Sequence, residues 1–466
     1  MNRRNFMKMM AATGMATTLP LSIKQANAAG LSDKFLVVVN MGGGWDPTSI
    51  CDPKGYKTDA DGNMIDGVYK SKSSTNMGNI NRVQVDNNKR FGDIQWSGIP
   101  DTADNNADTR ALIEAQYDDF FNTYGDRLVV VNGINTQTNS HSIGNRHSWS
   151  GRKDPGYPGI AALHAAAAAP ELPMSFITNG GYSYTGGLIA KSRANDVSYI
   201  TSELANANYY NNSSNADRGI YFQDNNGMAN EYGDIQAAIA RRQNRQQNAT
   251  NNQGFRDQLG QLFSVQGNDE TLKVFGDNMA AIENGEFNGN WNAGRNNGLK
   301  NQAKIAAAAF ASGVAVSANI SMGGYDTHNN HDQRHYRNAG NALEAVHYLN
   351  EALKFYGIAD RTLIMVASDF GRTPWFNNRS GKDHWSMTSN LIITPEGHQT
   401  GGKVFGETDE FFKAKKVDIN TGRADESGVE ITPAHVNKAV RKYLGIEGFA
   451  SAAGFDISVE DINLLG

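Results

Sequence analysis

The sequence predicts an α/β fold, with a largely parallel sheet, helices on both faces of the sheet and inserted cap segments. Two observations carry this prediction. Short apolar runs rich in β-branched residues are typical of strands buried on both faces, and they occur at 35–39, 128–131, 314–320 and 362–367. Helical patterns alternate with these runs, which favours a parallel sheet; they cover 109–124, 159–169, 301–312 and 337–356.

A last helix is expected at the C-terminal side of the chain. Thr432 is a good N-cap residue, Pro433 suits the first helical position, and the pattern continues to Leu444. The chain has 466 residues, which suits one large domain with insertions or two domains.

Composition excludes several classes of protein. With 39% hydrophobic residues, 20% charged residues and 49 glycines, the chain fits a globular protein rather than a disordered or coiled-coil one. Its formal charge of −5 gives no attraction to nucleic acid or to anionic lipid. Cys51 is the single cysteine, so no disulfide can form within the chain.

The first 28 residues are expected to be an export signal. Arg3 and Arg4 precede Phe6, Met7 and Lys8, which resembles a twin-arginine signal, and 26–28 reads Ala-Asn-Ala, a small-x-small cleavage site. Removal of 1–28 takes away four basic residues and no acid, so the formal charge falls from −5 to −9. We expect a periplasmic or otherwise exported protein that meets the twin-arginine translocase and has no membrane span after processing. The alternative is a cytosolic protein with a basic frayed end.

Two stretches are expected to be insertions, at 52–108 and 206–300. In the first, Asp59-Ala60-Asp61-Gly62-Asn63 is similar to a calcium loop, but Met64 and Lys70 stand where that loop needs glycine and glutamate. A hairpin turn is therefore the prediction there. The second stretch, with a helix expected at 234–247, is expected to form a cap or lid because it supplies aromatic and leucine side chains to pack.

Polar residues follow the predicted strands. In open α/β sheets, ligands bind beyond the carboxyl ends of the strands. The polar residues expected at this position are Asp46, Thr138, Ser140, His141, Asp326, His328 and Asp369.

The same segments contain a set of carboxylates and imidazoles. Asp326 and His328 are two residues apart, so in an extended segment both side chains point to one face. If a helix begins near Asn329 or Asn330, His331 and His335 share one face of it. Asp383 and His384 are adjacent. Oxygen and nitrogen ligands without thiolate suit zinc, manganese, magnesium or calcium, although any one of these histidines could instead be a surface or capping residue.

Taken together, these motifs resemble the twin-arginine-exported proteins of domain of unknown function 1501, over most of residues 1–406. The motifs are Arg3-Arg4, Gly43-Gly44-Trp45-Asp46, Ser140-His141, Gly324-Tyr325-Asp326-Thr327-His328, Ser368-Asp369-Phe370-Gly371-Arg372-Thr373-Pro374 and Asp383-His384. That family is similar to the alkaline phosphatase and sulfatase superfamily, whose members hold two metal ions near a nucleophile and hydrolyse or transfer phosphate or sulfate groups.

The resemblance implies roles for individual residues. The metal ligands would be Asp46, Asp326, His328 or His331, Asp369 and His384, holding one or two divalent ions. The catalytic residues would be Thr138, Ser140, His141 and Arg146. Among these Thr138 would be the nucleophile, with Ser140 and Thr136 as alternatives. Arg146 or Arg152 would hold the anionic group of the substrate.

The chain departs from the superfamily at two places. Phe370 stands where a histidine ligand usually follows the aspartate, so His141 or His147 would have to replace that ligand. The sulfatase nucleophile motif is broken, because Gly55 stands where its arginine belongs after Cys51 and Pro53. A formylglycine nucleophile is therefore not expected.

Three functions remain open at this point. The first is a metal-dependent hydrolase of phosphate or sulfate esters, with a small-molecule or saccharide ester as substrate. The second is a metal- or carbohydrate-binding periplasmic protein on the same fold without turnover. The third is a structural partner of another exported protein that binds no metal.

Overall fold

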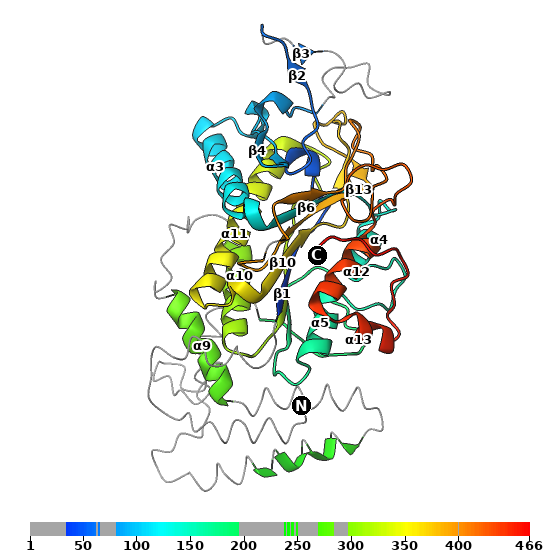
Figure 1. Cartoon of the computed structure of the whole chain (residues 1–466). Helices are drawn as coiled ribbons and strands as arrows, with labels where there is room; N and C mark the ends of the chain where they lie inside the picture. Colours follow the sequence, from blue (N-terminus) through cyan, green and yellow to red (C-terminus); the bar gives the residue numbers. More distant parts are fainter. Residues whose placement is uncertain are drawn as a thin grey trace.

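The computed structural model describes residues 34–61, 64–65, 81–194, 269–283, 297–398 and 400–466, together with parts of 237–249 (Figure 1). The expected signal at 1–28 lies outside the described residues, as does most of the expected cap at 206–300. Within the helix expected at 234–247, the described residues are helical.

An eight-stranded sheet forms the centre of the molecule, in the order β14-β6-β13-β10-β1-β9-β7-β8. Neighbouring strands are parallel except where β13 pairs with β10 and with β6. The strands are β1 (Phe35–Met41), β6 (Leu128–Asn135), β7 (Phe176–Thr178), β8 (Lys191–Ser192), β9 (Ser317–Met322), β10 (Thr362–Ala367), β13 (Met387–Ile393) and β14 (Lys403–Phe405). The prediction of an α/β fold with a largely parallel sheet is confirmed.

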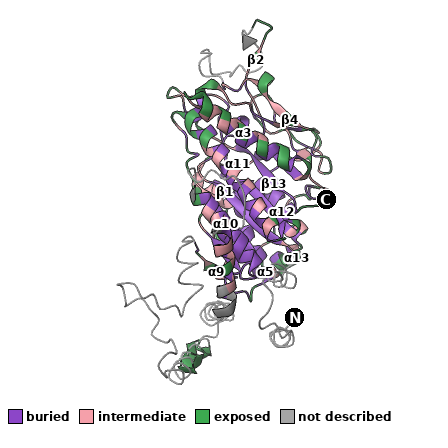
Figure 2. Cartoon of the chain, turned by 90° about the vertical axis from the view of Figure 1, so that its left-hand side faces the viewer, coloured by how far each residue is buried: buried purple, intermediate pink, exposed green. Residues whose placement is uncertain are grey.

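Helices cover both faces of this sheet (Figure 1). One layer contains α3 (Ala107–Tyr124), α9 (Asp269–Glu283), α10 (Asn297–Ala311) and α11 (His331–Phe355). The other contains α4 (His141–Ser150), α5 (Ile160–Ala168), α12 (Pro433–Leu444) and α13 (Glu447–Ala452). Figure 2 shows the buried residues concentrated along the sheet between these layers. Because helices cover both faces, every residue of β1 is buried, which explains its continuous apolar run.

Short elements complete the chain. Within the described residues, three two-stranded sheets pair β2 (Lys57–Thr58) with β3 (Met64–Ile65), β4 (Lys89–Phe91) with β5 (Ile94–Trp96), and β11 (Gly371–Arg372) with β12 (His384–Trp385). The pairing of β2 with β3 is antiparallel, so the hairpin predicted around 59–63 is confirmed. The 3-10 helices are η1 (Pro47–Ser49), η3 (Val85–Asn87), η4 (Asp101–Ala103), η5 (Gly125–Arg127) and η8 (Ala359–Arg361).

The predicted bounds of the C-terminal helix match those of α12. Thr432 caps α12, Pro433 is its first residue, and Gly445 ends it with a positive φ of 72°. In α11 the prediction was too short, since the helix begins at His331 rather than Arg337, directly after the N-cap Asn330. This start places His331 and His335 one turn apart on a single face, as expected.

The topology brings several loops to one edge of the sheet. Strands β1, β9 and β10 are parallel, so the loops that follow Met41, Met322 and Ala367 leave at the same edge. Because β13 is antiparallel to both β10 and β6, the carboxyl end of β6 also lies there. Among the described helices, none is both long and apolar enough to cross a membrane.

Candidate metal centre

A carboxylate and three histidines meet at this edge of the sheet. Asp326 and His328 lie in the loop between β9 and α11, His384 begins β12 just before β13, and His141 is the first residue of α4. These segments are far apart in the sequence, and the strand order alone brings them together.

The four side chains converge around one oxygen of Asp326. Asp326 Oδ1 lies 3.2 Å from His328 Nε2, 3.5 Å from His384 Nε2 and 3.7 Å from His141 Nε2. The Nε2 atoms of His328 and His384 are 3.1 Å apart. In the described part of the chain, His141, Asp326 and His384 form a group whose ligand atoms all lie within 4.8 Å of one another.

The Nδ1 atom of each imidazole, the ring nitrogen away from Asp326, is hydrogen-bonded to an oxygen. His141 Nδ1 lies 2.5 Å from Asp369 Oδ2, and His328 Nδ1 lies 2.9 Å from Asp383 Oδ1. His384 Nδ1 lies 2.8 Å from the carbonyl oxygen of Asn139. Carboxylate and carbonyl oxygens only accept, so each Nδ1 must donate its hydrogen. In the neutral imidazoles the three Nε2 lone pairs therefore face the Asp326 carboxylate.

A divalent cation bound between these atoms would accept the three lone pairs. Metal-bound histidines commonly donate their second ring N–H to a carboxylate or carbonyl, as all three do here. For a tetrahedral zinc ion with bonds of 2.0–2.1 Å, neighbouring ligand atoms lie about 3.3–3.4 Å apart. The three distances among Asp326, His328 and His384 are 3.1, 3.2 and 3.5 Å, so this triad has the spacing of ligands to one ion.

Arg372 fixes the shared carboxylate. Its side chain is fully buried, and its Nη2 donates to Asp326 Oδ1 at 2.6 Å. Its other donors hold backbone carbonyls, including that of Gly44 at 2.9 Å and that of Lys382 at 3.0 Å. Burial alone would raise the pKa of Asp326, but the hydrogen bond and charge of Arg372 lower it. Asp326 is thus kept ionised.

Asp369, expected as a metal ligand, lies behind His141 instead. Its Oδ1 accepts hydrogen bonds from Gly43 N at 3.2 Å, Gly44 N at 2.5 Å and Ser368 Oγ at 2.8 Å. The hydrogen bond from His141 to its Oδ2 raises the pKa of His141. A Cβ on Gly43, where φ is +118°, would lie 2.6 Å from Asp326 N, so only glycine allows this approach.

Asp46 and His331, also expected as ligands, lie in a separate buried cluster. Lys382 Nζ lies 2.5 Å from Asp46 Oδ2, and His331 Nε2 lies 3.1 Å from the same oxygen. The hydroxyls of Thr48 and Ser49 donate to Asp46 at 2.6 and 2.7 Å. Burial would raise the pKa of Asp46, but Lys382 holds it well below the usual value. The carboxylate already has its cation in the Lys382 ammonium.

His335 belongs to this buried cluster as well. Its ring stacks on His331 at 4.8 Å, and its Nε2 accepts the N–H of Asp46 at 2.7 Å. Burial lowers the pKa of His335 well below its ordinary value and also lowers that of His331. His328 and His331 were expected as alternatives for one metal ligand. In the structure they lie in two different clusters.

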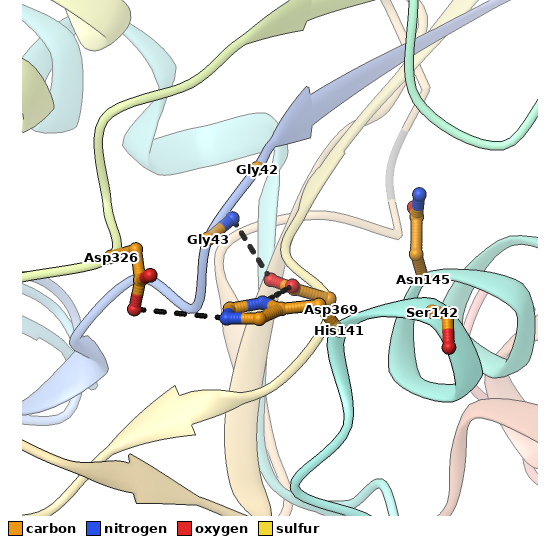
Figure 3. Close-up of a pocket in the computed structure, with 7 residues that line it drawn as sticks. All are labelled: Gly42, Gly43, His141, Ser142, Asn145, Asp326 and Asp369. Carbon is orange, nitrogen blue, oxygen red and sulfur yellow. Dashed lines mark hydrogen bonds and ion pairs between the residues drawn. The ribbon is translucent and has the colours of Figure 1, made fainter.

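A cavity of about 410 Å³ opens beside the His141 and Asp326 side chains (Figure 3). It is lined by Gly42, Gly43, His141, Ser142, Asn145, Asp326 and Asp369. In Figure 3 the His141 ring lies between the carboxylates of Asp326 and Asp369, while Ser142 and Asn145 project from the first turns of α4.

The hydroxyl residues expected as nucleophiles are not part of this lining. Thr136 is buried, and its hydroxyl donates to the carbonyl of Ser386 at 2.8 Å. Thr138 Oγ1 accepts the N–H of Ser140 at 3.1 Å, and Ser140 Oγ pairs with Ser142 Oγ at 3.3 Å.

The structure also places the arginines expected to bind an anion. Arg146 donates to the carbonyl of Lys153, and Arg152 pairs with Asp154 at 3.3 Å. Neither lines the cavity. Of the two histidines offered as the replacement ligand, His141 joins the cluster, whereas His147 is buried against the carbonyl of Thr136 at 2.9 Å.

Sequence reasoning did not assign roles to Arg372, Lys382, Ser142 and Asn145. Arg372 could have been found from its place four residues after Ser368, in the segment that follows a buried strand. Lys382 carries no such signal, because a lysine in a polar turn is usually solvated.

Comparison with known proteins gives one family match. Residues 33–421 match the model of a family described as "Protein of unknown function (DUF1501)". No curated protein matches the sequence. Among solved structures, the crystal structure of Ps i-CgsB in complex with a neocarrahexaose aligns over 93% of this chain and 75% of that one, at 8% identity and a TM-score of 0.34. At that TM-score the similarity supports no conclusion about function.

Proposed function

The chain belongs to the DUF1501 family, whose description gives no activity, and from the site itself we propose that it is an exported metal-dependent hydrolase of phosphate or sulfate esters. In this proposal the fold is alkaline-phosphatase-like. The mostly parallel sheet, with its carboxylate and histidines beyond the strand ends, supports that relationship.

One observation carries the proposal. Three imidazoles have their Nδ1 atoms committed to oxygen acceptors, so their Nε2 lone pairs and the Asp326 carboxylate converge on one place. Asp326, His328 and His384 fit a divalent ion, and three protein ligands leave a position open for water or substrate, as in catalytic zinc sites. An ion held there would polarise the ester oxygen of a bound phosphate or sulfate group.

A second function is favoured by the same cluster if His141 also binds the ion. Four protein ligands would close the coordination sphere, which is typical of structural zinc sites. The protein would then bind metal without turnover. The distance of 3.7 Å from His141 Nε2 to Asp326 Oδ1 is longer than the three distances among Asp326, His328 and His384, which favours the open site.

The metal content of the protein tests this proposal. Residues 29–466 would be purified from the periplasm without chelator or histidine tag, and the ions measured by elemental analysis. We expect about one tightly held ion per chain, lost in Asp326→Asn/His384→Gln. The matched control is Asp360→Asn/His398→Gln, the same two exchanges outside the cluster, which should keep the ion.

Turnover is then measured with 4-nitrophenyl phosphate and 4-nitrophenyl sulfate. Release of nitrophenol by the metal-loaded protein, and not by the metal-site variant, would support the hydrolase. A folded protein that holds no stoichiometric ion would contradict it.

The proposed export is tested separately. If 1–28 is a twin-arginine signal, Arg3→Lys/Arg4→Lys should leave the precursor unprocessed in the cytoplasm.

A further inference from the structure

We propose that His141 is the nucleophile of this site and that its Nε2 atom accepts a phosphoryl group from a phosphate ester, giving a phosphohistidine intermediate. The inference rests on the proposed function and deepens it, since it names phosphate esters as the substrate class. It also assigns the attacking atom, which the hydroxyl residues of the neighbouring loop do not supply.

The first argument is the way in which His141 is held. Asp369 is 4% exposed, and its Oδ1 is fixed by two backbone N–H groups and the Ser368 hydroxyl. Its Oδ2 accepts the Nδ1 hydrogen of His141 at 2.5 Å. A buried aspartate in this position fixes the tautomer of an imidazole and stabilises positive charge on the ring. In the neutral ring, Nε2 therefore carries the free lone pair that a nucleophile needs.

The second argument is that the His141 ring is accessible. The His141 side chain is 40% exposed and lines the cavity. The rings of Phe370 and His384 pack against it, with centroids 4.7 and 4.6 Å away, and restrict its rotation. By contrast, the Ser142 hydroxyl in the same lining is paired with the Ser140 hydroxyl, which is not a base that could activate it.

The third argument is that three side chains other than His141 have the spacing to hold the ion. Asp326, His328 and His384 already form a triad with ligand spacing, and His141 lies farthest from the shared oxygen. An imidazole beside the triad would face a phosphate whose oxygen occupies the open position of the ion.

The surroundings of Nε2 suit a phosphoryl group. His141 opens α4, a helix of ten residues whose N-cap Ser140 makes no side-chain cap bond, and free N–H groups at a helix start attract anions. Asn145 lines the cavity, and its Oδ1 is buried without a hydrogen-bond partner among the described residues. Because this amide oxygen only accepts hydrogen bonds, we assign it to a hydroxyl group of the substrate.

The reaction has two balanced steps. In the first, the Nε2 lone pair forms a bond to phosphorus while the bond from phosphorus to the ester oxygen breaks. The alcohol leaves with that electron pair and takes a proton from water. In the second, a water oxygen attacks phosphorus and passes one proton to the hydroxide left by the first step, the bond to Nε2 breaks, and the imidazole recovers its lone pair while phosphate leaves. The Nδ1 hydrogen remains shared with Asp369 throughout.

The experiment traps the intermediate. The metal-loaded protein is mixed with 4-nitrophenyl phosphate and quenched in base, in which phosphohistidine survives, and the peptide containing His141 is analysed by mass spectrometry. We expect one added phosphoryl group on His141. His141→Gln should keep the ion and lose turnover by on the order of 10³-fold or more. His141→Gly should regain part of the turnover when free imidazole is added, while His398→Gln should behave as the unaltered protein.

Each outcome decides the inference. A labelled His141, with rescue of His141→Gly by imidazole, supports it. Loss of the ion from His141→Gln would show that His141 is a ligand and overturn it, as would turnover that persists in that variant. If the metal-loaded protein releases nitrophenol from the sulfate and not from the phosphate, this inference fails and the proposed hydrolase stands. If no ion binds, the proposed function itself fails.

Discussion

The orientation of each cluster histidine depends on a single hydrogen bond from its Nδ1 atom. Asp369 holds His141, Asp383 holds His328 and the carbonyl of Asn139 holds His384. Asp383 differs from Asp369 because its side chain is 56% exposed. Burial would raise the pKa of Asp383, but the hydrogen bonds from His328 and Asn377 lower it. Asp383 is therefore an ionised acceptor that can be removed without opening a hole in the core.

Removal of Asp383 should weaken metal binding without unfolding the protein. In Asp383→Ala, His328 loses the partner that fixes its tautomer, and we expect metal affinity to fall by about 10- to 100-fold. The measurement is competition with a chromogenic chelator. Asp360→Ala, which removes another exposed aspartate, is the control. Equal affinities of the two variants would mean that Asp383 does not position His328.

At the scale of elements, the turn at 377–384 is locked onto the segment that carries His328. Lys382 N donates to the carbonyl of Thr327 at 3.0 Å, and His331 N donates to the carbonyl of Ser380 at 2.8 Å. A Cβ on Gly381 would lie 2.0 Å from the His328 carbonyl carbon, so the two backbones touch. The buried Lys382 side chain then forms an ion pair with Asp46, the N-cap of η1 in the segment that follows β1. These hydrogen bonds, the close backbone contact and the ion pair fix the distance between His328 and His384.

Breaking the ion pair between Lys382 and Asp46 should destabilise the fold strongly. Lys382→Met leaves a buried carboxylate without its cation, and we expect the free energy of unfolding to fall by about 3–5 kcal/mol. In Asp46→Asn/Lys382→Met neither charge remains, so its loss should be smaller than the sum of the two single losses. Urea unfolding of the four proteins measures this difference. An additive double variant would show that the two groups are not coupled.

Much of the architecture could be predicted, because its signals are local. The run at 362–367 is apolar after Thr362 and matches β10 residue for residue. The start of α11 near Asn330 could be given only as one possibility, under which His331 and His335 share a face. Asn330 adopts a positive φ of 44° and makes no side-chain cap bond. That feature is absent from propensity patterns.

The site could be predicted only in part, because its partners are not local. Asp326, His328 and His384 were recognised as ligand types at strand ends. Nothing in the sequence indicates that Asp46 faces a buried lysine rather than the cavity, since Lys382 is 336 residues away along the chain. Whether a strand-end aspartate binds a metal or an ammonium is decided by packing, which residue type and spacing do not reveal.

At the scale of the whole molecule, buried neutral histidines tie stability to pH. His164 in α5 is 1% exposed, and its Nε2 lies 3.0 Å from the carbonyl of Lys34. Burial lowers the pKa of His164 to about 4 from the ordinary 6.5. Burial also lowers the pKa values of His331 and His335. Between pH 6.5 and about 4 the unfolded chain binds a proton at His164 that the folded chain does not, so stability must fall as the pH falls through this window.

His164 allows this effect to be measured apart from the metal centre. A shift from 6.5 to about 4 corresponds to about 3 kcal/mol of stability that is present above pH 6.5 and lost on acidification. In His164→Gln the side chain no longer titrates, so the metal-free variant should lose about 3 kcal/mol less than the unaltered protein between pH 7 and pH 4. Urea unfolding at a series of pH values makes the comparison. Parallel curves for the two proteins would mean that His164 takes up its proton at the same pH in the folded chain as in the unfolded chain.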